Sequence, residues 1–505
     1  MAKQSLLNLC MMKNVIFKTV NGNHYCYSYA RRMIFPCHPI LKHLIENDGL
    51  CEKDDCLQQP KSIVVDGIEY SCNLVKKYQE KYAFLKDNHV FDEIDPMDLL
   101  FSDITGESIM NSIQECAVLT FEATERCNLR CRYCIYGDFY STHEDRIGRD
   151  MNFEDAKTIL DQMIPLWIAN RNLLYKRIVI GFYGGEALLN IGFIKDTVEY
   201  LKTITEITGL KFAYTLTTNG VNLNLFYDFL IQHDFYLVIS LDGNAWSNQY
   251  RVFPNGEHSF SVVYENIKLL QQRFPEYFKK NIDFNPVLHD KNDEVETRRY
   301  FQKEFSKTPL MSVVKTPDKD DSMAFNYIPL SQMDLQIGSD LSDFKKSSLA
   351  FSLLHTLRNH SNLIFSDYSE TGIARQTLKK YPTGTCFPFS RKMFISAQGL
   401  LFPCERINFK YAMSDINSAV DFNVNETALF YSTVFEKISH LCSMCYRFMD
   451  CESCFFNNAK IDGDKFQCSD FSNKEKYANT LAYYWSFIES NPALYDEVYK
   501  NLSYE

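Results

Sequence analysis

The sequence predicts an α/β protein centred on a parallel sheet, either open or curved into a barrel. An α+β module precedes the sheet, and a cysteine-rich region follows it. Three observations support this prediction. Strand-like and helix-like segments alternate between residues 113 and 320, which is typical of βα units. Four polar or glycine-rich motifs each stand where a strand-like segment ends. Cysteines crowd into the last quarter of the chain and are absent between Cys134 and Cys386.

The central segment 113–320 divides into about six βα units. Short apolar runs rich in β-branched residues predict strands, and apolar residues at helical spacing predict the helices between them. The expected strands are 117–124, 177–185, 211–220, 235–243, 281–288 and 310–315, and the expected helices are 152–168, 194–205, 222–233, 260–273 and 292–305. Because parallel strands end on one side of a sheet, we expect CNLRCRYC, YGGE, TTNG and SLDG to share a rim.

The remaining segments are assigned by their patterns. Residues 1–112 alternate short strand signals with helical ones and carry no catalytic motif, which predicts an α+β module. Residues 321–375 are expected to form a bridge, with SSLAFSLLHTLRNH as a helix that covers the barrel mouth. The cysteine-rich region spans 376–475, and residues 476–505 are expected to form a helical tail.

Composition excludes several classes of protein. The chain of 505 residues is 46% hydrophobic and 23% charged, and its formal net charge of −11 comes without a long Lys/Arg cluster, so we expect no nucleic-acid partner. No apolar run reaches the roughly 18 residues that span a bilayer, and the first residues lack the apolar stretch of a signal peptide. We therefore expect a cytoplasmic protein without a membrane partner. In that reducing compartment, clustered cysteines indicate metal ligands rather than disulfides.

The first cysteine motif raises the question of a missing ligand. Cys127, Cys131 and Cys134 stand at C-x3-C-x2-C spacing. A [4Fe–4S] cluster is normally held by four cysteines. Three therefore leave one iron open to a cosubstrate, as catalytic zinc sites keep one position open for substrate. Taken alone, the same spacing would also fit a structural zinc site.

CNLRCRYC, followed by YGGE at the next strand end, resembles the signature of the radical S-adenosylmethionine (SAM) superfamily. The resemblance implies a partial (β/α)6 TIM-like barrel in which the three cysteines hold a [4Fe–4S] cluster and SAM chelates its open iron. The implied SAM-binding residues are Tyr133, Gly184, Gly185, Glu186, Thr217, Asn219, Ser240 and Arg251.

These residues have different implied roles. The two glycines let the backbone approach the methionyl part of SAM, and Glu186 accepts from its ammonium group. Thr217, Asn219, Ser240 and Arg251 resemble the positions that hold ribose and carboxylate, for which the planar fork of Arg is suited. Thr217, Asn219 and Asp242 also fit ordinary turn and cap residues. Arg251 lies one residue closer to SLDG than is usual in the family.

The cysteines of 376–475 are similar to the pattern of the SPASM domain, except that two residues instead of three separate Cys451 and Cys454. The resemblance implies two auxiliary [4Fe–4S] clusters, which makes three in the chain. Cys442, Cys445, Cys451 and Cys468 would hold the outer cluster, and Cys386, Cys404 and Cys454 the inner one. The inner set has three thiols, so one iron would be open or held by another group. A zinc ribbon is the alternative, which fits four of the seven cysteines.

This combination resembles the maturases of ribosomally synthesised and post-translationally modified peptides. In that interpretation residues 1–112 recognise the leader of a precursor peptide, for example as a strand added to a sheet edge. A flavodoxin or ferredoxin-type donor supplies the electron for reductive cleavage of SAM. The 5′-deoxyadenosyl radical then abstracts hydrogen, and a thioether, carbon–carbon or carbon–oxygen crosslink or a related oxidation follows.

Two alternative functions remain open. Anaerobic sulfatase maturases resemble this chain in barrel and SPASM domain, and in them an Asp that acts as base follows the cysteine corresponding to Cys404. Glu405 stands in that place here and is the candidate catalytic residue, although a carboxylate on the exposed rim or an Arg partner is an alternative. The second alternative is a non-enzymatic zinc or iron–sulfur scaffold.

Overall fold

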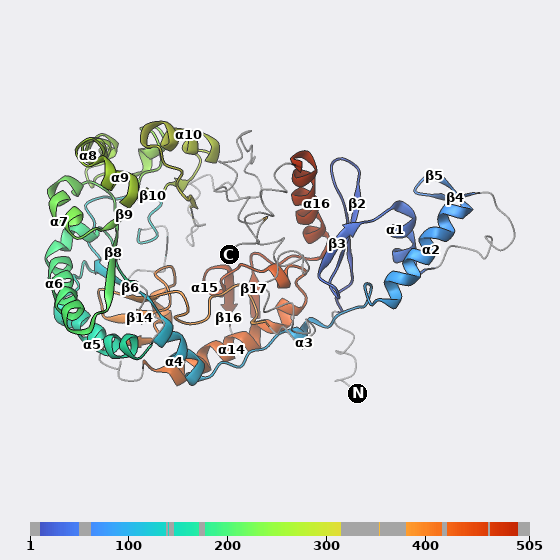
Figure 1. Cartoon of the computed structure of the whole chain (residues 1–505), viewed down its shortest axis with the longest axis horizontal. Coiled ribbons are helices and arrows are strands. Elements are labelled where there is room, and N and C mark those ends of the chain that lie inside the picture. Colours follow the sequence, from blue (N-terminus) through green and yellow to red (C-terminus); the bar gives the residue numbers. More distant parts are fainter. Residues whose placement is uncertain are drawn as a thin grey trace. The chain divides into compact units, whose positions relative to one another are not determined.

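The computed structural model describes residues 11–49, 62–137, 140, 146–170, 177–314, 353, 380–416, 422–462 and 465–492. Its contacts divide the chain into two compact units, drawn in Figure 1. The first unit comprises 1–103, 350–385 and 432–505, and the second comprises 104–349 and 386–431. The helix expected in SSLAFSLLHTLRNH lies outside the described residues except for Leu353. The predicted domain boundaries stay a prediction.

The second unit contains an eight-stranded sheet in the order β10-β9-β8-β7-β6-β13-β14-β15. Its first five strands are β6 (Val118–Thr124), β7 (Arg177–Gly184), β8 (Lys211–Thr218), β9 (Tyr236–Ile239) and β10 (Ile282–Phe284). All of their pairings are parallel, which confirms the predicted α/β partial barrel. The last expected strand, β12 (Ser312–Val313), instead pairs with β11 (Val287–Leu288) in a separate parallel ladder.

Helices cover the outer side of these strands, as Figure 1 shows for α5 to α10. Their bounds are α4 (Gly106–Glu115), α5 (Phe153–Ala169), α6 (Ile191–Thr208), α7 (Tyr227–Gln232), α8 (Phe260–Arg273), α9 (Pro275–Asn281) and α10 (Glu294–Phe305). Local sequence sets several ends. Asn152 caps α5 by accepting from the Asp155 amide, and Gly209 ends α6 in the left-handed conformation.

A hairpin extends the sheet beyond the barrel. β13 (Met393–Ile395) pairs in parallel with β6, and β14 (Leu400–Phe402) and β15 (Ser414–Asp415) follow in antiparallel pairing. Gly399 makes the β13–β14 turn with φ +78°, and an added Cβ would stand 2.8 Å from Ile416. The turn therefore needs glycine. β14 ends two residues before Cys404.

The first unit begins with the expected α+β elements. A three-stranded antiparallel sheet of β1 (Val15–Lys18), β2 (His24–Ser28) and β3 (Met33–Pro36) precedes α1 (Pro39–Glu46), β4 (Ser62–Val65), β5 (Ile68–Ser71), α2 (Cys72–Asp87) and α3 (Pro96–Leu99). Cys26 and Cys37 are buried among α1 and α2 side chains, as expected for isolated small apolar residues.

The cysteine-rich elements share a core with this sheet. They are α14 (Val424–Ser443, which begins in the second unit), η9 (Phe448–Asp450), α15 (Phe455–Asn458), β16 (Ala459–Asp462), β17 (Lys465–Cys468) and the tail helix α16 (Lys474–Ser490). Tyr27 and Tyr29 of β2 pack with Phe448 and with Tyr477 of α16. The Tyr29 hydroxyl donates to the carbonyl of Tyr446. The N-terminal sheet therefore supports the loop between Cys445 and Cys451.

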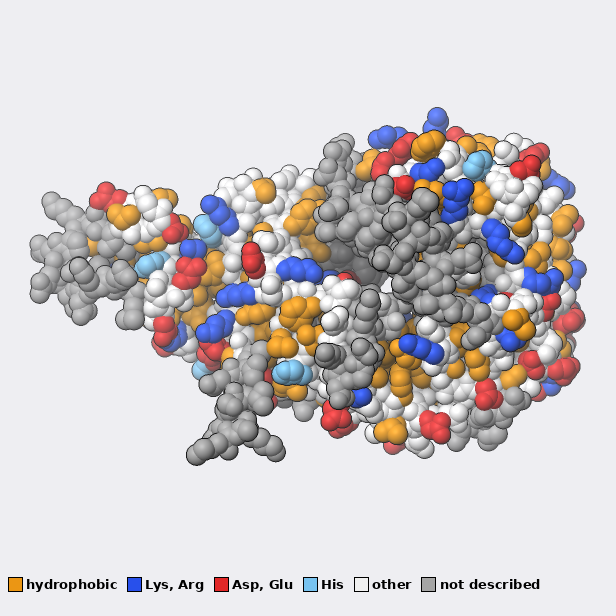
Figure 2. All heavy atoms as spheres, turned by 180° about the vertical axis from the view of Figure 1, so that it is seen from behind, with side chains coloured by type: hydrophobic (Ala, Val, Ile, Leu, Met, Phe, Trp, Pro, Cys, Tyr) orange, Lys and Arg blue, Asp and Glu red, His pale blue; other side chains and the backbone are white. Residues whose placement is uncertain are grey.

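The described surface mixes charges of both signs. On the face seen in Figure 2, acidic and basic side chains are interspersed with hydrophobic ones. Within the described residues, no helix combines the length and apolar character that a membrane crossing requires.

Candidate functional site

The carboxyl ends of β6 to β9 bring the predicted motifs to one rim. The loop after β6 carries the three cysteines, and the chain after β7 pairs with its beginning, because the Gly185 amide donates to Thr124 (2.8 Å) and the Glu186 amide to Arg126 (2.8 Å). The Asn219 side-chain amide, after β8, donates to Asn128 (2.7 Å) and lies 3.7 Å from the Cys127 sulfur. Three strand ends therefore meet at the cysteine loop.

The cysteine loop is held in place by backbone bonds. The Arg130 amide donates to Val252 (2.7 Å) and the Arg132 amide to Tyr250 (3.0 Å), so the loop lies against the segment that leads to Arg251. Burial raises the pKa of Cys131 to about 12 and also raises the pKa values of Cys127 and Cys134. A metal would have to lower these pKa values again, because the thiolate is the form that binds metals.

Three thiols from one loop are a donor set that fits an iron–sulfur cluster. Each thiol lies close enough to a second one to change its pKa. In a cluster the cysteines bind different iron atoms, so they need not converge on one point. In the described part of the chain, no three His, Cys, Asp or Glu side chains are grouped closely enough for a single metal ion.

Gly184 and Gly185 are explained by the approach of two chain segments. A Cβ on Gly184 would stand 2.3 Å from the carbonyl oxygen of Thr124, and one on Gly185 would stand 2.3 Å from that of Arg126. Gly184 also has φ +138°, which side chains rarely adopt. Both positions therefore require glycine for packing alone, and their contact with SAM stays a prediction.

Glu186 is buried, with 1% of its surface exposed. Its carboxylate accepts from the Leu188 amide (3.1 Å), the Thr218 hydroxyl (2.8 Å) and the Asn219 amide (2.7 Å). Burial raises its pKa despite these donors. Since a carboxylate offers about four acceptor positions, capacity for one further donor remains.

At the strand end of TTNG the two threonines have different surroundings, and the role of Thr217 toward SAM stays a prediction. Thr218 binds Glu186, whereas Thr217, the predicted residue, is half-buried on the other side of the strand. The alternation of a strand could have indicated that only one of the two threonines faces Glu186. Ser240, also predicted, is half-buried, and its amide donates to the Thr218 carbonyl (2.8 Å).

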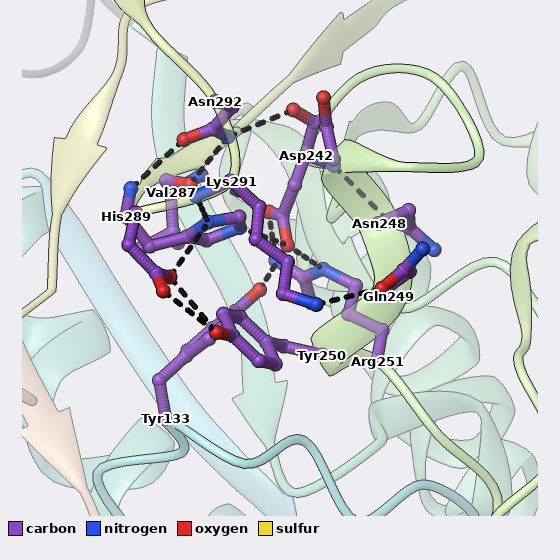
Figure 3. A network of polar contacts seen from close by, with 12 residues as sticks. Tyr133, Asp242, Asn248, Gln249, Tyr250, Arg251, Val287, His289, Lys291 and Asn292 are labelled. Carbon is purple, nitrogen blue, oxygen red and sulfur yellow. Dashed lines mark hydrogen bonds and ion pairs between the residues drawn. The ribbon is translucent and has the colours of Figure 1, made fainter. Parts of the chain in front are cut away.

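Arg251 is committed to a protein carboxylate, as Figure 3 shows. Its Nε and Nη2 donate to the two oxygens of Asp242 at 3.0 and 2.9 Å. The Tyr133 hydroxyl and the Val287 amide donate to the same carboxylate. Although burial alone would raise the pKa of Asp242, the charge and hydrogen bonds of Arg251 lower it to about 2. The role of Arg251 toward the SAM carboxylate stays a prediction.

The turn after β11 completes this network, and no sequence motif predicted it. Asn292 donates to the carbonyls of Asp242 (3.1 Å) and Val287 (3.0 Å). His289 is 4% exposed, and its Nδ1 accepts from the Lys291 amide (3.1 Å), so a neutral ring carries its proton on Nε2. Nε2 lies 3.7 Å from Asp242. The polar stretch after an expected strand was the available signal for these residues.

Four C-terminal cysteines line one cavity of the first unit. Cys442, Cys445, Cys451 and Cys468 surround a small hollow together with Leu100, Thr383, Leu441, Arg447, Phe448, Asp470 and Phe471. Burial raises the pKa of Cys445 to about 11 and raises the pKa of Cys442 further. The four residues predicted as one ligand set thus lie around one hollow, and their thiol chemistry fits an iron–sulfur cluster.

The predicted inner set is distributed over both units. Cys386, which is exposed, and Cys404, which is half-buried, belong to the second unit, whereas Cys454 belongs to the first. This ligand set stays a prediction. Glu405 is paired rather than free: its oxygens accept from Lys392 at 3.1 and 3.2 Å, and Oε2 lies 3.5 Å from the Cys404 sulfur. Arg406 is farther from it, at 3.9 Å.

Comparison with protein families agrees with this geometry. Residues 121–300 match the model of the radical SAM superfamily. This segment contains the cysteine loop and the ends of β6 to β10.

Among curated proteins, the cysteine-type anaerobic sulfatase-maturating enzyme of Clostridium novyi is 29% identical over 164 residues, which are 32% of this chain and 42% of that protein. The radical SAM cyclopropyl synthase TigE of Paramaledivibacter caminithermalis is 22% identical over 262 residues, 48% of this chain and 52% of that protein. The chain spans about half or less of the length of these relatives.

Two solved structures are also similar. The structure of native anSMEcpe with bound AdoMet has a TM-score of 0.49 and 19% identity, covering 75% of this chain and 99% of that one. Streptococcus suis SuiB bound to the precursor peptide SuiA has a TM-score of 0.35 and 14% identity, covering 86% of this chain and 94% of that one.

Proposed function

We propose, from the premise that this chain belongs to the radical SAM superfamily, that it is an enzyme that modifies a residue of a precursor peptide. The modification is a thioether, carbon–carbon or carbon–oxygen crosslink, or a related oxidation. The observation that carries the proposal is the second cysteine site. A hollow lined by Cys442, Cys445, Cys451 and Cys468 accompanies the cysteine rim of the barrel in one chain. The presence of both cysteine sites distinguishes this chain from a radical SAM domain that stands alone.

At the rim, the residues of this chain would bind the cluster and SAM, orient them and shield them from water. When bound at Cys127, Cys131 and Cys134, a [4Fe–4S] cluster with SAM would supply a 5′-deoxyadenosyl radical, which takes hydrogen from a C–H bond. Asn219 and the backbone of residues 250–252 hold the loop that presents the thiols. The remaining acceptor capacity of Glu186 suits an ammonium group. Burial of these groups strengthens their interactions and excludes water.

The auxiliary sites are proposed to accept the electron that the substrate loses as the new bond closes. The outer set lines its hollow, and Cys386, Cys404 and Cys454 form the inner set, which makes three clusters in all. Glu405, next to Cys404, is the proposed catalytic carboxylate. A flavodoxin or ferredoxin-type protein is the proposed electron donor.

The outer edge of β3 is the proposed leader-binding site. The sheet order is β1-β2-β3, and within the described residues no strand pairs with the outer side of β3. The Cys37 amide donates to His24 of β2 (2.8 Å). Because inward and outward groups alternate along a strand, Ile34 and Pro36 turn their backbone polar groups outward. A leader strand could therefore pair with the Ile34 amide and carbonyl.

The proposal is tested by anaerobic reconstitution and by coexpression with a precursor. We expect a brown protein that holds iron and forms 5′-deoxyadenosine with dithionite, and a precursor peptide that loses two hydrogens per modified site. The triple variant Cys127→Ala, Cys131→Ala, Cys134→Ala should form no 5′-deoxyadenosine yet keep iron at the C-terminal sites. A colourless wild-type protein that holds zinc would contradict the proposal and support a scaffold.

A sulfatase-maturase-like activity is the second candidate. It is favoured by the 29% identity to the Clostridium novyi enzyme and by Glu405 next to Cys404. The test is incubation of the reconstituted enzyme with a sulfatase-derived peptide that carries Cys or Ser at the modified position. Oxidation of that residue, together with no change in the candidate precursor, would favour this activity over peptide crosslinking.

A further inference from the structure

Two buried glutamates, Glu122 in β6 and Glu125 directly after it, bind segments from distant parts of the second unit. Glu122 has 0% of its surface exposed. One of its oxygens accepts from Nη1 of Arg146 (2.5 Å), and the other accepts from the backbone amide of Ala397 (2.9 Å). Arg146 follows the cysteine motif, and Ala397 lies in the β13–β14 turn. One carboxylate thus joins the cysteine loop region to the hairpin.

Glu125 repeats this arrangement three residues later. Its Oε2 accepts from three successive backbone amides, those of Ile147, Gly148 and Arg149, at 3.0, 3.0 and 2.9 Å. Its Oε1 accepts from the side-chain amide of Gln398 at 3.1 Å, while Nη1 of Arg149 lies 3.4 Å away. The loop of residues 147–149 and the β13–β14 turn are therefore bound a second time, by a glutamate that lies two residues before Cys127.

The hairpin of β13 and β14 depends on these additional bonds, because its own pairing with the barrel is short. β13 pairs with β6 through three residues, from Met393 opposite Leu119 to Ile395 opposite Phe121. Strand register is set by the side-chain pattern and by turn geometry. A ladder of three residues contributes few backbone bonds, so bonds from outside the ladder add to the definition of its register. The bonds from Glu122 to Ala397 and from Glu125 to Gln398 can form only when β13 pairs with β6 in the observed register. The hairpin leads directly to Cys404 and Glu405.

The arrangement would be costly if it served stability alone. Burying a carboxylate carries a large desolvation penalty that its partners only partly offset, and an apolar contact of equal volume is often as stable. Directional bonds define positions more narrowly than apolar packing does. A position that must be held accurately is therefore the better explanation for two such carboxylates.

We propose that Glu122 and Glu125 are positioning residues that fix Cys404 and Glu405 relative to the loop of Cys127, Cys131 and Cys134. The inference rests on the proposed function, in which hydrogen abstraction at the rim and the later step near Cys404 act on one peptide residue. A hairpin displaced by a residue would leave SAM cleavage possible but separate it from productive modification.

Two matched variants test the inference. Gln398→Ala and Arg149→Ala each remove one donor from the same oxygen of Glu125, but Gln398 lies on the hairpin and Arg149 on the loop. Since misplacement by about 1 Å can cost a factor of about 100 in rate, we expect Gln398→Ala to raise the ratio of 5′-deoxyadenosine to modified peptide at least about tenfold. Arg149→Ala should leave the ratio near that of the wild type.

Hydrogen–deuterium exchange of the metal-free protein gives a readout without catalysis. Gln398→Ala should speed exchange in β13 and β14 and leave α5 and α6 unchanged, whereas Arg149→Ala should speed it at residues 146–150. Glu122→Gln should act like Gln398→Ala if it folds. Faster hairpin exchange with an unchanged product ratio would overturn the inference alone. A wild-type enzyme that forms no 5′-deoxyadenosine would overturn the proposed function and this inference with it.

Discussion

Single residues at the rim are bound mainly to one another, and this changes how each motif is interpreted. Asp242, in the SLDG turn, accepts from Arg251, Tyr133 and Val287 while it is completely buried. A turn residue at the surface would need no such set of donors. Asp242 is therefore the centre of a network that supports the cysteine loop through Tyr133.

Asp242→Asn should destabilise the protein by about 3–5 kcal/mol, because it leaves the buried guanidinium of Arg251 without a counter-charge. Urea unfolding of the metal-free protein measures this. Asp290→Asn is the control: it faces the Tyr250 hydroxyl and its side chain is 25% exposed, so we expect a loss below about 1.5 kcal/mol.

The same carboxylate gives a pH dependence. The pKa of Asp242 is lowered from 3.8 to about 2 in the folded protein. The stability that the ionised carboxylate of Asp242 gives to the folded protein is therefore fully present above about pH 4 and is lost as the pH falls toward 2. The difference in unfolding free energy between wild type and Asp242→Asn should shrink over that interval. A difference that stays constant from pH 6 to pH 2.5 would contradict the assignment.

Gly185→Ala separates a packing role from a ligand role. Because its Cβ would stand 2.3 Å from the carbonyl oxygen of Arg126, we expect a loss of about 1–3 kcal/mol in the metal-free protein. Gly192→Ala, in α6 with nothing within 4 Å, should instead stabilise by about 0.5–1 kcal/mol. Thermal unfolding compares them. An unchanged stability of Gly185→Ala would mean that the glycine serves a ligand only.

Among the elements, β3 presents outward backbone groups at its edge, and its sequence only partly indicates which of them can bond. Pro36 occupies an outward position, where its missing N–H costs no bond of the β2 ladder. The outward amide of Ile34 is the available donor on this edge.

Ile34→Pro should weaken leader binding, because it removes that outward donor and keeps the inward bonds. We expect at least about a tenfold rise in the dissociation constant of a precursor peptide, since each lost strand-addition bond costs roughly 0.5–1.5 kcal/mol and the ring also hinders pairing. Fluorescence anisotropy with labelled leader measures it. Ile34→Val keeps the amide and is the control; equal weakening by both variants would place the leader elsewhere.

At the scale of the whole molecule, the N-terminal segment is part of a larger unit. Residues 1–103 belong to the same compact unit as 432–505. Tyr27 and Tyr29 occupy a core with Phe448, Met449 and Tyr477, and the cysteine hollow borders Phe448. The leader-binding proposal therefore cannot be tested by simple truncation.

Deleting residues 1–103 should lower the iron retained at the outer site as well as the binding of a precursor. The deletion exposes the core of the cysteine-rich elements, and losing even one buried Tyr or Phe costs about 3–5 kcal/mol. Iron analysis and circular dichroism of the truncated protein measure this. Full iron content with an unchanged melting temperature would show that the cysteine-rich elements fold independently.

Much of the fold could be predicted from local patterns. Periodicity located β6 to β10 and most of their helices, because these signals lie within a few neighbouring residues. The short helix α9 was not predicted. The separate pairing of β12 with β11 was not predicted, since a two-residue ladder depends on how the chain returns to the sheet. The distribution of the cysteine-rich segment over two compact units likewise depends on contacts between distant parts of the chain.

The sequence by itself determined the chemistry available to this protein: the spacing of Cys127, Cys131 and Cys134, the motifs at the strand ends and the second group of cysteines. Spacing within a loop is a local property, so the sequence shows it without knowledge of the fold. Tertiary structure alone decided the partners of each charge. Arg251 binds Asp242, Glu405 binds Lys392, and Glu122 joins residues 146 and 397. Burial makes such pairing obligatory, but which partner lies within reach depends on how segments pack, whether they are 9 residues apart, as Asp242 and Arg251 are, or 275 apart, as Glu122 and Ala397 are.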